Sequence, residues 1–148
     1  MMIIKHSSEI KKSPEYIFPW IAEPDKAIKW QKNVKESEII INSPEIVGTT
    51  FKEVIEENCN RLSMNGVITE YIKDKKIQFH LESKIHKLDV EYSLESINTG
   101  SKICIDTQIN WKFPINILSI FIGSKMKKGI IKQMELEILE LKKICEKG

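Results

Sequence analysis

Residues 77–111 read IQFHLESKIHKLDVEYSLESINTGSKICIDTQINW, and apolar and polar side chains alternate along three runs of this stretch. The runs cover 77–82, 88–95 and 103–111, and the turn-forming sequence Asn98-Thr99-Gly100 separates the last two. Alternation places every second side chain on the same face of a strand. Three such runs in succession predict an antiparallel sheet with one apolar face and one face in water.

Four further strands are expected before this stretch, at 2–10, 34–42, 49–57 and 61–72. Two short helices, at 14–21 and from 24 to near Trp30, are expected between the first two strands. Ser13-Pro14 and Pro24 are typical of helix starts. A β-bulge is expected at Gly66. The chain therefore predicts seven strands with two short helices after the first strand.

A long helix at 115–146 is expected to cover the apolar face of the sheet. Its apolar residues recur at helical spacing, namely at Leu118, Met126, Ile130, Met134, Ile138 and Leu141. At about 1.5 Å per residue, a helix of this length reaches roughly 48 Å, enough to cross seven strands. Gly123 and Gly129 are expected to bend the helix or to let it approach the sheet closely.

Short motifs along nearly the whole chain resemble the START/Bet v 1-like (SRPBCC) superfamily, and within it the polyketide cyclase/dehydrase and lipid-transport group. The matching segments are 13–18, 20–22, 24–25, Trp30 with Val34, 47–51, 67–70, 100–103 and 139–142. Lys32 departs from the pattern, because that group commonly has proline there. The resemblance implies an α+β helix-grip fold, in which a curved antiparallel sheet wraps around the long C-terminal helix and leaves a cavity between them.

Composition indicates one globular domain spanning residues 1–148, with 41% hydrophobic and 30% charged residues and a net charge of +2. Arg61 is the only arginine among the 23 basic residues. Arginine supplies the forked contacts that read bases and phosphates. The sequence therefore argues against a nucleic-acid partner.

The three cysteines, Cys59, Cys104 and Cys145, have no metal-ligand or disulfide-framework spacing. They are expected to be free thiols, and neither a metal nor a cofactor is expected. The longest apolar run, 115–123, is too short to span a membrane. No signal peptide is recognisable at the N-terminus. A soluble, cytoplasmic protein without stable membrane insertion is therefore expected, and the lysines at 125–132 are interpreted as a solvated helix face rather than an interfacial one.

An apolar cavity lining is the main functional hypothesis, because the inward positions of the strands are apolar with few polar points. The candidate ligand-binding residues are Trp30, Phe51, Ile55, Met64, Phe79, Tyr92, Ile105, Ile109, Trp111 and Phe121, with Leu81 and Leu94 also expected to face inward. The alternative for each is that it fills a solid core. Ligand entry is expected near Trp30, Phe51 and Phe121.

Catalytic candidates are few. Glu53 shares its strand parity with Phe51 and Ile55, so it is a candidate for an inward carboxylate with a raised pKa; a solvated glutamate at the cavity mouth is the alternative. Tyr92 carries a hydroxyl that needs a partner when buried. The three histidines, His6, His80 and His86, are expected to be exposed, and they form no catalytic arrangement.

Three functions follow from these observations. The first is binding or transport of a small hydrophobic molecule, such as a lipid or a polyketide-like compound. The second is a cyclase or dehydratase acting on a polyketide-like substrate, with Glu53 and Tyr92 as acid–base groups. The third is a protein–protein adaptor in which the cavity is vestigial.

Overall fold

A computed structural model describes residues 1–57 and 60–148. It contains the strands and helices in the predicted order: β1 (Met2–Ile10), α1 (Pro14–Ala22), α2 (Pro24–Ala27), β2 (Val34–Ile41), β3 (Thr50–Glu57), β4 (Asn60–Ile72), β5 (Lys76–Glu82), β6 (His86–Ile97), β7 (Gly100–Trp111) and α3 (Ile115–Lys147). The predicted α+β helix-grip fold is confirmed. The second short helix ends three residues earlier than expected, and turns follow it up to Trp30.

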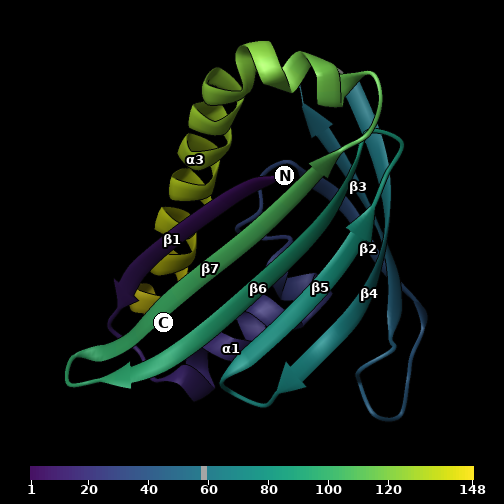
Figure 1. The fold of residues 1–148 in the computed structure, drawn as a ribbon. Helices are drawn as coiled ribbons and strands as arrows, with labels where there is room; N and C mark the ends of the chain where they lie inside the picture. The colour runs from purple at the N-terminus through teal and green to yellow at the C-terminus, as the bar shows by residue number, and fades with distance from the viewer. Residues whose placement is uncertain (58–59) are drawn as a thin grey trace.

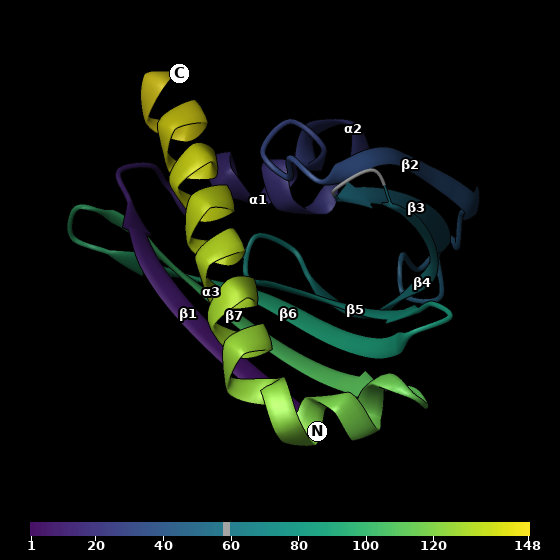
Figure 2. The same cartoon turned by 90° about the horizontal axis from the view of Figure 1, so that it is seen from above.

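The seven strands form one antiparallel sheet in the order β1-β7-β6-β5-β4-β3-β2. Its strong curvature is visible in Figure 1, and Figure 2 shows α3 crossing its concave side in front of β1, β7 and β6, with α1 and α2 on the side of β2 and β3. Strand β7 pairs with β1 on one side and β6 on the other. The helices thus cover the concave face of the curved sheet (Figure 2).

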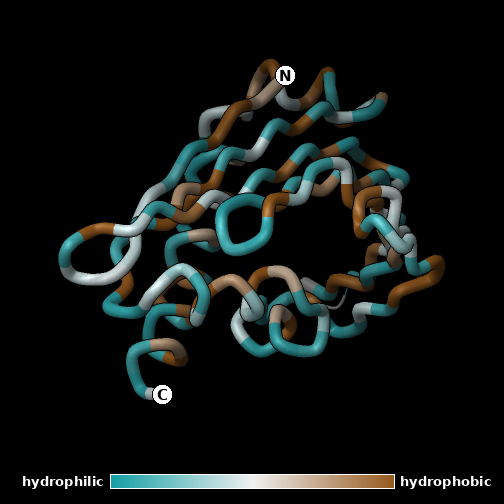
Figure 3. The backbone as a smooth tube through the Cα atoms, turned by 90° about the horizontal axis from the view of Figure 1, so that it is seen from below, coloured by the Kyte–Doolittle hydropathy of each residue, from teal (hydrophilic) through white to brown (hydrophobic). Residues whose placement is uncertain are grey.

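The alternation of the sequence is visible along the strands in Figure 3. Cross-strand pairs on the concave face include Ile105 with Tyr92 and Ile103 with Leu94. Ile103 is fully buried, and Leu94 is nearly so. Because a strand reverses its side chain at each residue, this register also turns Thr107 inward.

The C-terminal end of α3 is fastened to the junction between β1 and α1. The backbone N–H of Lys11 donates a hydrogen bond to the Glu146 carboxylate over 2.9 Å, and Lys12 Nζ donates one to the carbonyl of Gly148 over 2.6 Å. Ser101 Oγ donates a hydrogen bond to the carbonyl of Lys12 over 2.7 Å. Buried Leu141 on α3 belongs to the same hydrophobic cluster as the core residues of α1. This end of the helix is therefore well anchored.

Gly66 has a different role from the predicted one. The irregularity in β4 lies between Ile68 and Glu70, while Gly66 pairs regularly with Phe51 on β3. A Cβ atom at Gly66 would clash with the Phe51 ring. The glycine therefore makes room for an aromatic ring on the concave face, and the predicted bulge at this position was wrong.

The first turns of α3 are the main departure from the predicted packing. Leu118 and Phe121 are 52% and 79% exposed, so they do not cover the sheet. Figure 1 shows these turns, in light green, at an angle to the rest of the helix. Gly123-Ser124 is a pair that commonly permits such a bend. A Cβ at Gly123 or Gly129 would meet no neighbouring atom, so neither glycine serves a close approach to the sheet.

Among the described residues, no helix combines the length and the apolar character that a membrane span requires.

Candidate functional site

A cavity lies between the helices and the concave face of the sheet, and it consists of two adjoining hollows. The helix-side hollow, of about 430 Å³, lies between α3 and strands β6 and β7. The strand-side hollow, of about 260 Å³, lies between the segment joining α1 to β2 and strands β2 to β6. Both are lined by Val90, Tyr92 and Glu137, so these three residues stand where the hollows meet.

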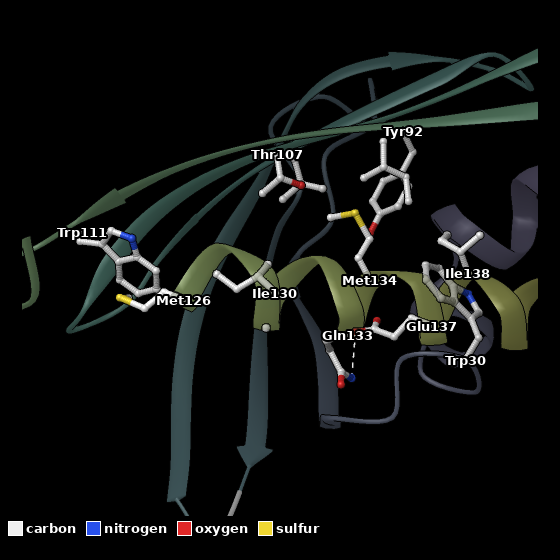
Figure 4. A pocket seen from close by; sticks show the side chains of 13 residues that line it. Trp30, Tyr92, Thr107, Trp111, Met126, Ile130, Gln133, Met134, Glu137 and Ile138 are labelled. Carbon is white, nitrogen blue, oxygen red and sulfur yellow. Dashed lines mark hydrogen bonds between the residues drawn. The ribbon is translucent and has the colours of Figure 1, made fainter. Parts of the chain in front are cut away.

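The helix-side hollow is bounded by aromatic and aliphatic side chains from both elements. Figure 4 shows Trp111 beside Met126 at one end and Trp30 beside Ile138 at the other, with the Tyr92 hydroxyl directed toward α3 near Met134. At 3.6 residues per turn, the hollow thus extends along the helix over about three turns.

Aromatic rings form one wall of the strand-side hollow. Phe51 and Phe79 meet edge to face with ring centroids 5.5 Å apart, and Phe79 meets Tyr92 in the same way at 6.2 Å. Trp30 in turn meets the Tyr92 ring at 6.2 Å. Such edge-to-face contacts fix the rings against one another. Tyr92 is therefore held by rings on two sides.

Two carboxylates and a phenol face this apolar space. Burial raises the pKa of Glu53 to about 7. Burial also raises the pKa of Glu137 to about 7; the hydrogen bond from Gln133 Nε2, 3.3 Å from Glu137 Oε1, opposes this shift, and the charge of Glu53 adds to it. The pKa of Tyr92 is raised by burial first, and then by the charges of Glu137 and Glu53. The three groups therefore influence one another's protonation.

No positive charge compensates these carboxylates within residues 1–57 and 60–148. Neither Glu53 nor Glu137 forms a salt bridge there, and none of the described residues lining the two hollows is a lysine, arginine or histidine. The Gln31 side chain lines the strand-side hollow and acts on Tyr92 against the raised pKa. The polar side chains that line the two hollows are thus all acidic or neutral among the described residues.

Two tryptophans at opposite ends of the helix-side hollow differ in their hydrogen bonding. Trp30 is fully buried, and its Nε1 donates a hydrogen bond to the carbonyl of Trp20 over 2.7 Å. Trp111 Nε1 is also buried, but it finds no acceptor in the part of the chain that the structure describes. Trp30 is thus fixed by a hydrogen bond, whereas the buried Trp111 N–H has no acceptor among the described residues.

Most of the residues expected to bind a ligand do line the cavity. Those in the helix-side hollow are Trp30, Tyr92, Ile105 and Trp111, and those in the strand-side hollow are Phe51, Ile55, Met64, Phe79 and Tyr92. Glu53 lines the strand-side hollow as well. Ile109 is buried but is not one of the described lining residues of either hollow. Phe121 is 79% exposed and is not one of the described lining residues of either hollow, so its expected inward orientation was wrong.

Among the polar lining residues that sequence reasoning missed are Gln31, Thr107, Gln133 and Glu137. A signal existed for three of them. Glu137 lies three residues after Met134 and Gln133 three residues after Ile130, which places both on the apolar face of α3. Thr107 shares its strand parity with Ile105. Gln31 follows a turn, and its position has no periodicity to indicate it.

One of the three histidines also differs from expectation. His86 is buried, its Nδ1 lies 2.7 Å from Ser83 Oγ, and its ring packs 5.2 Å from that of Trp111. Burial lowers the pKa of this histidine. It holds Trp111 from the side of the β5–β6 turn. His80, by contrast, lies on the outer face, 2.9 Å from Asp89.

The two cysteines within the described residues, Cys104 and Cys145, do not line either hollow. Cys104 is half-buried and Cys145 is buried, and both are free thiols. Cys59 lies outside the described residues. Within the described ranges, no group of three histidine, cysteine or acidic side chains gathers in a metal-binding arrangement.

No protein-family model and no curated protein matches the sequence. Solved structures do resemble it in fold. TTHA0849 from Thermus thermophilus superposes with a TM-score of 0.82 at 12% identity, covering 97% of each chain. A START superfamily protein from Mycobacterium smegmatis gives 0.82 at 14% identity, covering 98% of this chain and 97% of that one. Ara h 8.0201 gives 0.64 at 17% identity, covering 95% and 97%. The fold is therefore the START/Bet v 1-like fold that the sequence motifs resemble.

Proposed function

We propose that the protein binds a small hydrophobic molecule in the cavity between α3 and the concave face of the sheet. The observation that carries this proposal is the pair of adjoining hollows, about 430 and 260 Å³, with linings that are mainly aromatic and aliphatic. Cavities of this size suit small organic ligands. A lipid or polyketide-like compound is the class of ligand that we expect.

The fold neighbours support the proposal by analogy only, because one fold serves many functions. A START-like or Bet v 1-like fold is consistent with hydrophobic ligand binding. The free thiols of Cys104 and Cys145 suit a reducing compartment. We therefore propose that the protein acts in the cytoplasm. We also propose that residues 1–148 form a single domain.

An enzymatic function is the second candidate. Glu53 and Glu137 have pKa values raised to about 7, which is the range in which a carboxyl group can both accept and donate a proton near neutral pH. A cyclase- or dehydratase-like reaction would use these carboxylates with Tyr92. In an enzyme, Glu53→Gln should retain ligand affinity and lose about 10²–10⁴-fold in turnover; in a carrier there is no turnover to lose.

Two glycines on α3 allow a matched test of the cavity. Gly129 lines the helix-side hollow, Gly123 does not, and a Cβ atom at either position meets no neighbouring atom. Gly129→Phe should project a ring over the hollow without disturbing the fold, and Gly123→Phe is the control. Fatty acids, fatty alcohols, alkylamines, sterols and flavonoid-like aromatics would be screened by thermal shift, and freshly purified protein by native mass spectrometry.

The proposal expects at least one apolar compound to raise the melting temperature, by several degrees at a hundredfold excess over Kd. The shift should shrink in Gly129→Phe and persist in Gly123→Phe. If no apolar compound raises the melting temperature and none is retained through purification, the proposal is wrong. The adaptor function would then take its place, and copurification of a protein partner would be the next test.

A further inference from the structure

We propose that the hydrophobic ligand carries a positively charged amine, which the carboxylates of Glu53 and Glu137 bind in the strand-side hollow that both of them line. This inference rests on the proposed function and specifies the chemistry of the ligand's polar end. It arises from a mismatch in the cavity: two acidic side chains face an apolar space with no basic residue lining it among the described residues.

A buried carboxylate without a cation is costly, because burial removes its hydration and nothing replaces it. A protonated amine would supply the missing charge and donate hydrogen bonds to the carboxylate oxygens. Tyr92 and Gln31 line the strand-side hollow with both carboxylates, and Gln133 is hydrogen-bonded to Glu137. The oxygen atoms of these three side chains can accept further ammonium N–H bonds.

The aromatic rings near these carboxylates also favour a cationic ligand. Trp30 and Phe79 both meet the Tyr92 ring edge to face. Phe79 and Tyr92 line the same hollow as Glu53 and Glu137. Ring faces attract cations. The apolar walls of both hollows then receive the remainder of the molecule. A fatty acid, by contrast, would bring a third negative charge to Glu53 and Glu137.

Three probes of equal chain length test this inference: octylamine, 1-octanol and octanoate, titrated by calorimetry at pH 8. We expect octylamine to bind at least tenfold more tightly than octanol, and octanoate to bind most weakly. Glu53→Gln combined with Glu137→Gln should remove the preference for the amine and leave octanol affinity unchanged. Glu135→Gln, at an exposed position of the same helix, is the control.

The outcomes separate the two proposals. Equal affinity for the three probes, or a preference for octanoate, overturns the amine inference and leaves hydrophobic binding in place. Failure of all three to bind at millimolar concentration, together with a failed thermal-shift screen, counts against the proposed function itself. Retention of the amine preference in the double variant would also overturn the inference.

A second inference comes from a different part of the molecule, the apolar tip formed by Phe113 and residues 117–122. We infer that this tip docks on an anionic lipid surface. Phe113, Ile120 and Phe121 are each more than three-quarters exposed, and Ile117, Leu118 and Ile122 are about half exposed. Exposed apolar side chains in one contiguous patch commonly mark an interaction surface.

Charge identifies the occupant of this surface. No acidic residue occurs between Asp106 and Glu135, whereas lysines at 125, 127, 128 and 132 follow the apolar tip. An apolar tip followed by these lysines complements the interface of an anionic bilayer. The apolar side chains enter the boundary of the acyl chains, and the lysines contact the headgroups. A second copy of the chain would bring the same lysines to this surface and be repelled. The tip adjoins the Trp111–Met126 end of the cavity along the chain.

Vesicle cosedimentation tests this inference, with phosphatidylcholine alone and with a 7:3 mixture of phosphatidylcholine and phosphatidylglycerol. We expect binding to the mixed vesicles only, weakened by added salt. Ile120→Ser with Phe121→Ser should lower the binding at least tenfold, while Leu139→Ser, a half-exposed position on the same helix, should not change it. Absence of binding to the mixed vesicles, or full binding by the double variant, would overturn the inference, as would a dimer in sedimentation analysis that the double variant dissolves.

Discussion

Gln133 donates a hydrogen bond to the carboxylate of Glu137, one turn further along α3, over 3.3 Å, and both side chains face the cavity. The amide thus holds a carboxylate whose pKa is nevertheless raised to about 7, because burial outweighs the hydrogen bond. Glu53, on β3, lines the strand-side hollow together with Glu137, and burial raises its pKa to about 7 as well. The two carboxyl groups of the cavity therefore titrate near neutral pH.

Stability should consequently fall as the pH rises. The folded-state pKa of each glutamate, about 7, lies above the ordinary value of 4.5, so the folded protein binds these protons more tightly than the unfolded chain. Their stabilising contribution is present below pH 4.5 and is lost as the pH rises through about 7. We expect a loss of about 2–3 kcal/mol in the free energy of unfolding for each glutamate.

Urea denaturation at pH 5 and pH 8 measures this loss. Glu53→Gln and Glu137→Gln should each reduce the difference between the two pH values, and Glu135→Gln should not. Both cavity variants should be more stable than the parent at pH 8. Lower stability of either variant at pH 8 would show that the charged carboxylate is favourably paired.

Gly66 should be intolerant of a side chain, because a Cβ there clashes with the ring of Phe51. Gly66→Ala should lower the free energy of unfolding by about 1–3 kcal/mol. Gly129→Ala, where the Cβ meets no neighbour, should instead be neutral or stabilising by up to about 1 kcal/mol. Combining Gly66→Ala with Phe51→Leu should recover part of the loss, and additive losses in the double variant would contradict the proposed clash.

The two cavity tryptophans should respond differently to removal of their N–H group. Trp30→Phe leaves the Trp20 carbonyl without its donor, so we expect a loss of about 1–3 kcal/mol beyond the effect of ring size. Trp111→Phe removes a buried N–H that has no acceptor in the described chain. Beyond the effect of ring size, it should lower the free energy of unfolding by less than about 1 kcal/mol. Equal losses from the two substitutions would argue that Trp111 is also paired in solution.

Thiol reactivity should separate the two described cysteines. Cys145 is buried and its pKa is raised to about 11 by burial first and then by the neighbouring Glu146, so it carries little thiolate at pH 8. Cys104 is half-buried and should react first. Labelling with a thiol reagent followed by peptide mapping, with Cys145→Ala as the reference, should show Cys145 modified only when the protein unfolds.

The strands and the C-terminal part of α3 could be predicted because their side-chain pattern repeats. Alternation in 77–111 determines which side chains face inward, and it correctly turned Ile105 and Tyr92 to the same face. Gly66 was misinterpreted because its partner, Phe51, lies fifteen residues away and only the strand register brings the two together. Local sequence can indicate a glycine, but not the ring that requires it.

The site was only partly predictable for the same reason. Glu53 was indicated by its parity. The spacing of Glu137 from Met134 indicates only that it lies on the apolar face of α3, and the curvature of the sheet sets which helical turns face the cavity. The apolar spacing of α3 also suggested that Leu118 packs inward, and Phe121 was expected to line the cavity. The bend in the helix and the extent of the sheet, both tertiary features, leave them exposed.

The methionines provide the most direct measurement of whether the cavity holds a ligand. Met64 lines the strand-side hollow, Met126 and Met134 line the helix-side hollow, and Met1 is 77% exposed. Protein labelled with ¹³C at the methionine methyl groups would be titrated with octylamine and, separately, with 1-octanol. Binding in the cavity predicts ligand-to-methyl Overhauser effects and shift changes at Met64, Met126 and Met134, with Met1 unchanged. Unchanged signals at all three cavity methionines with both probes, or changes confined to Met1, would contradict the account.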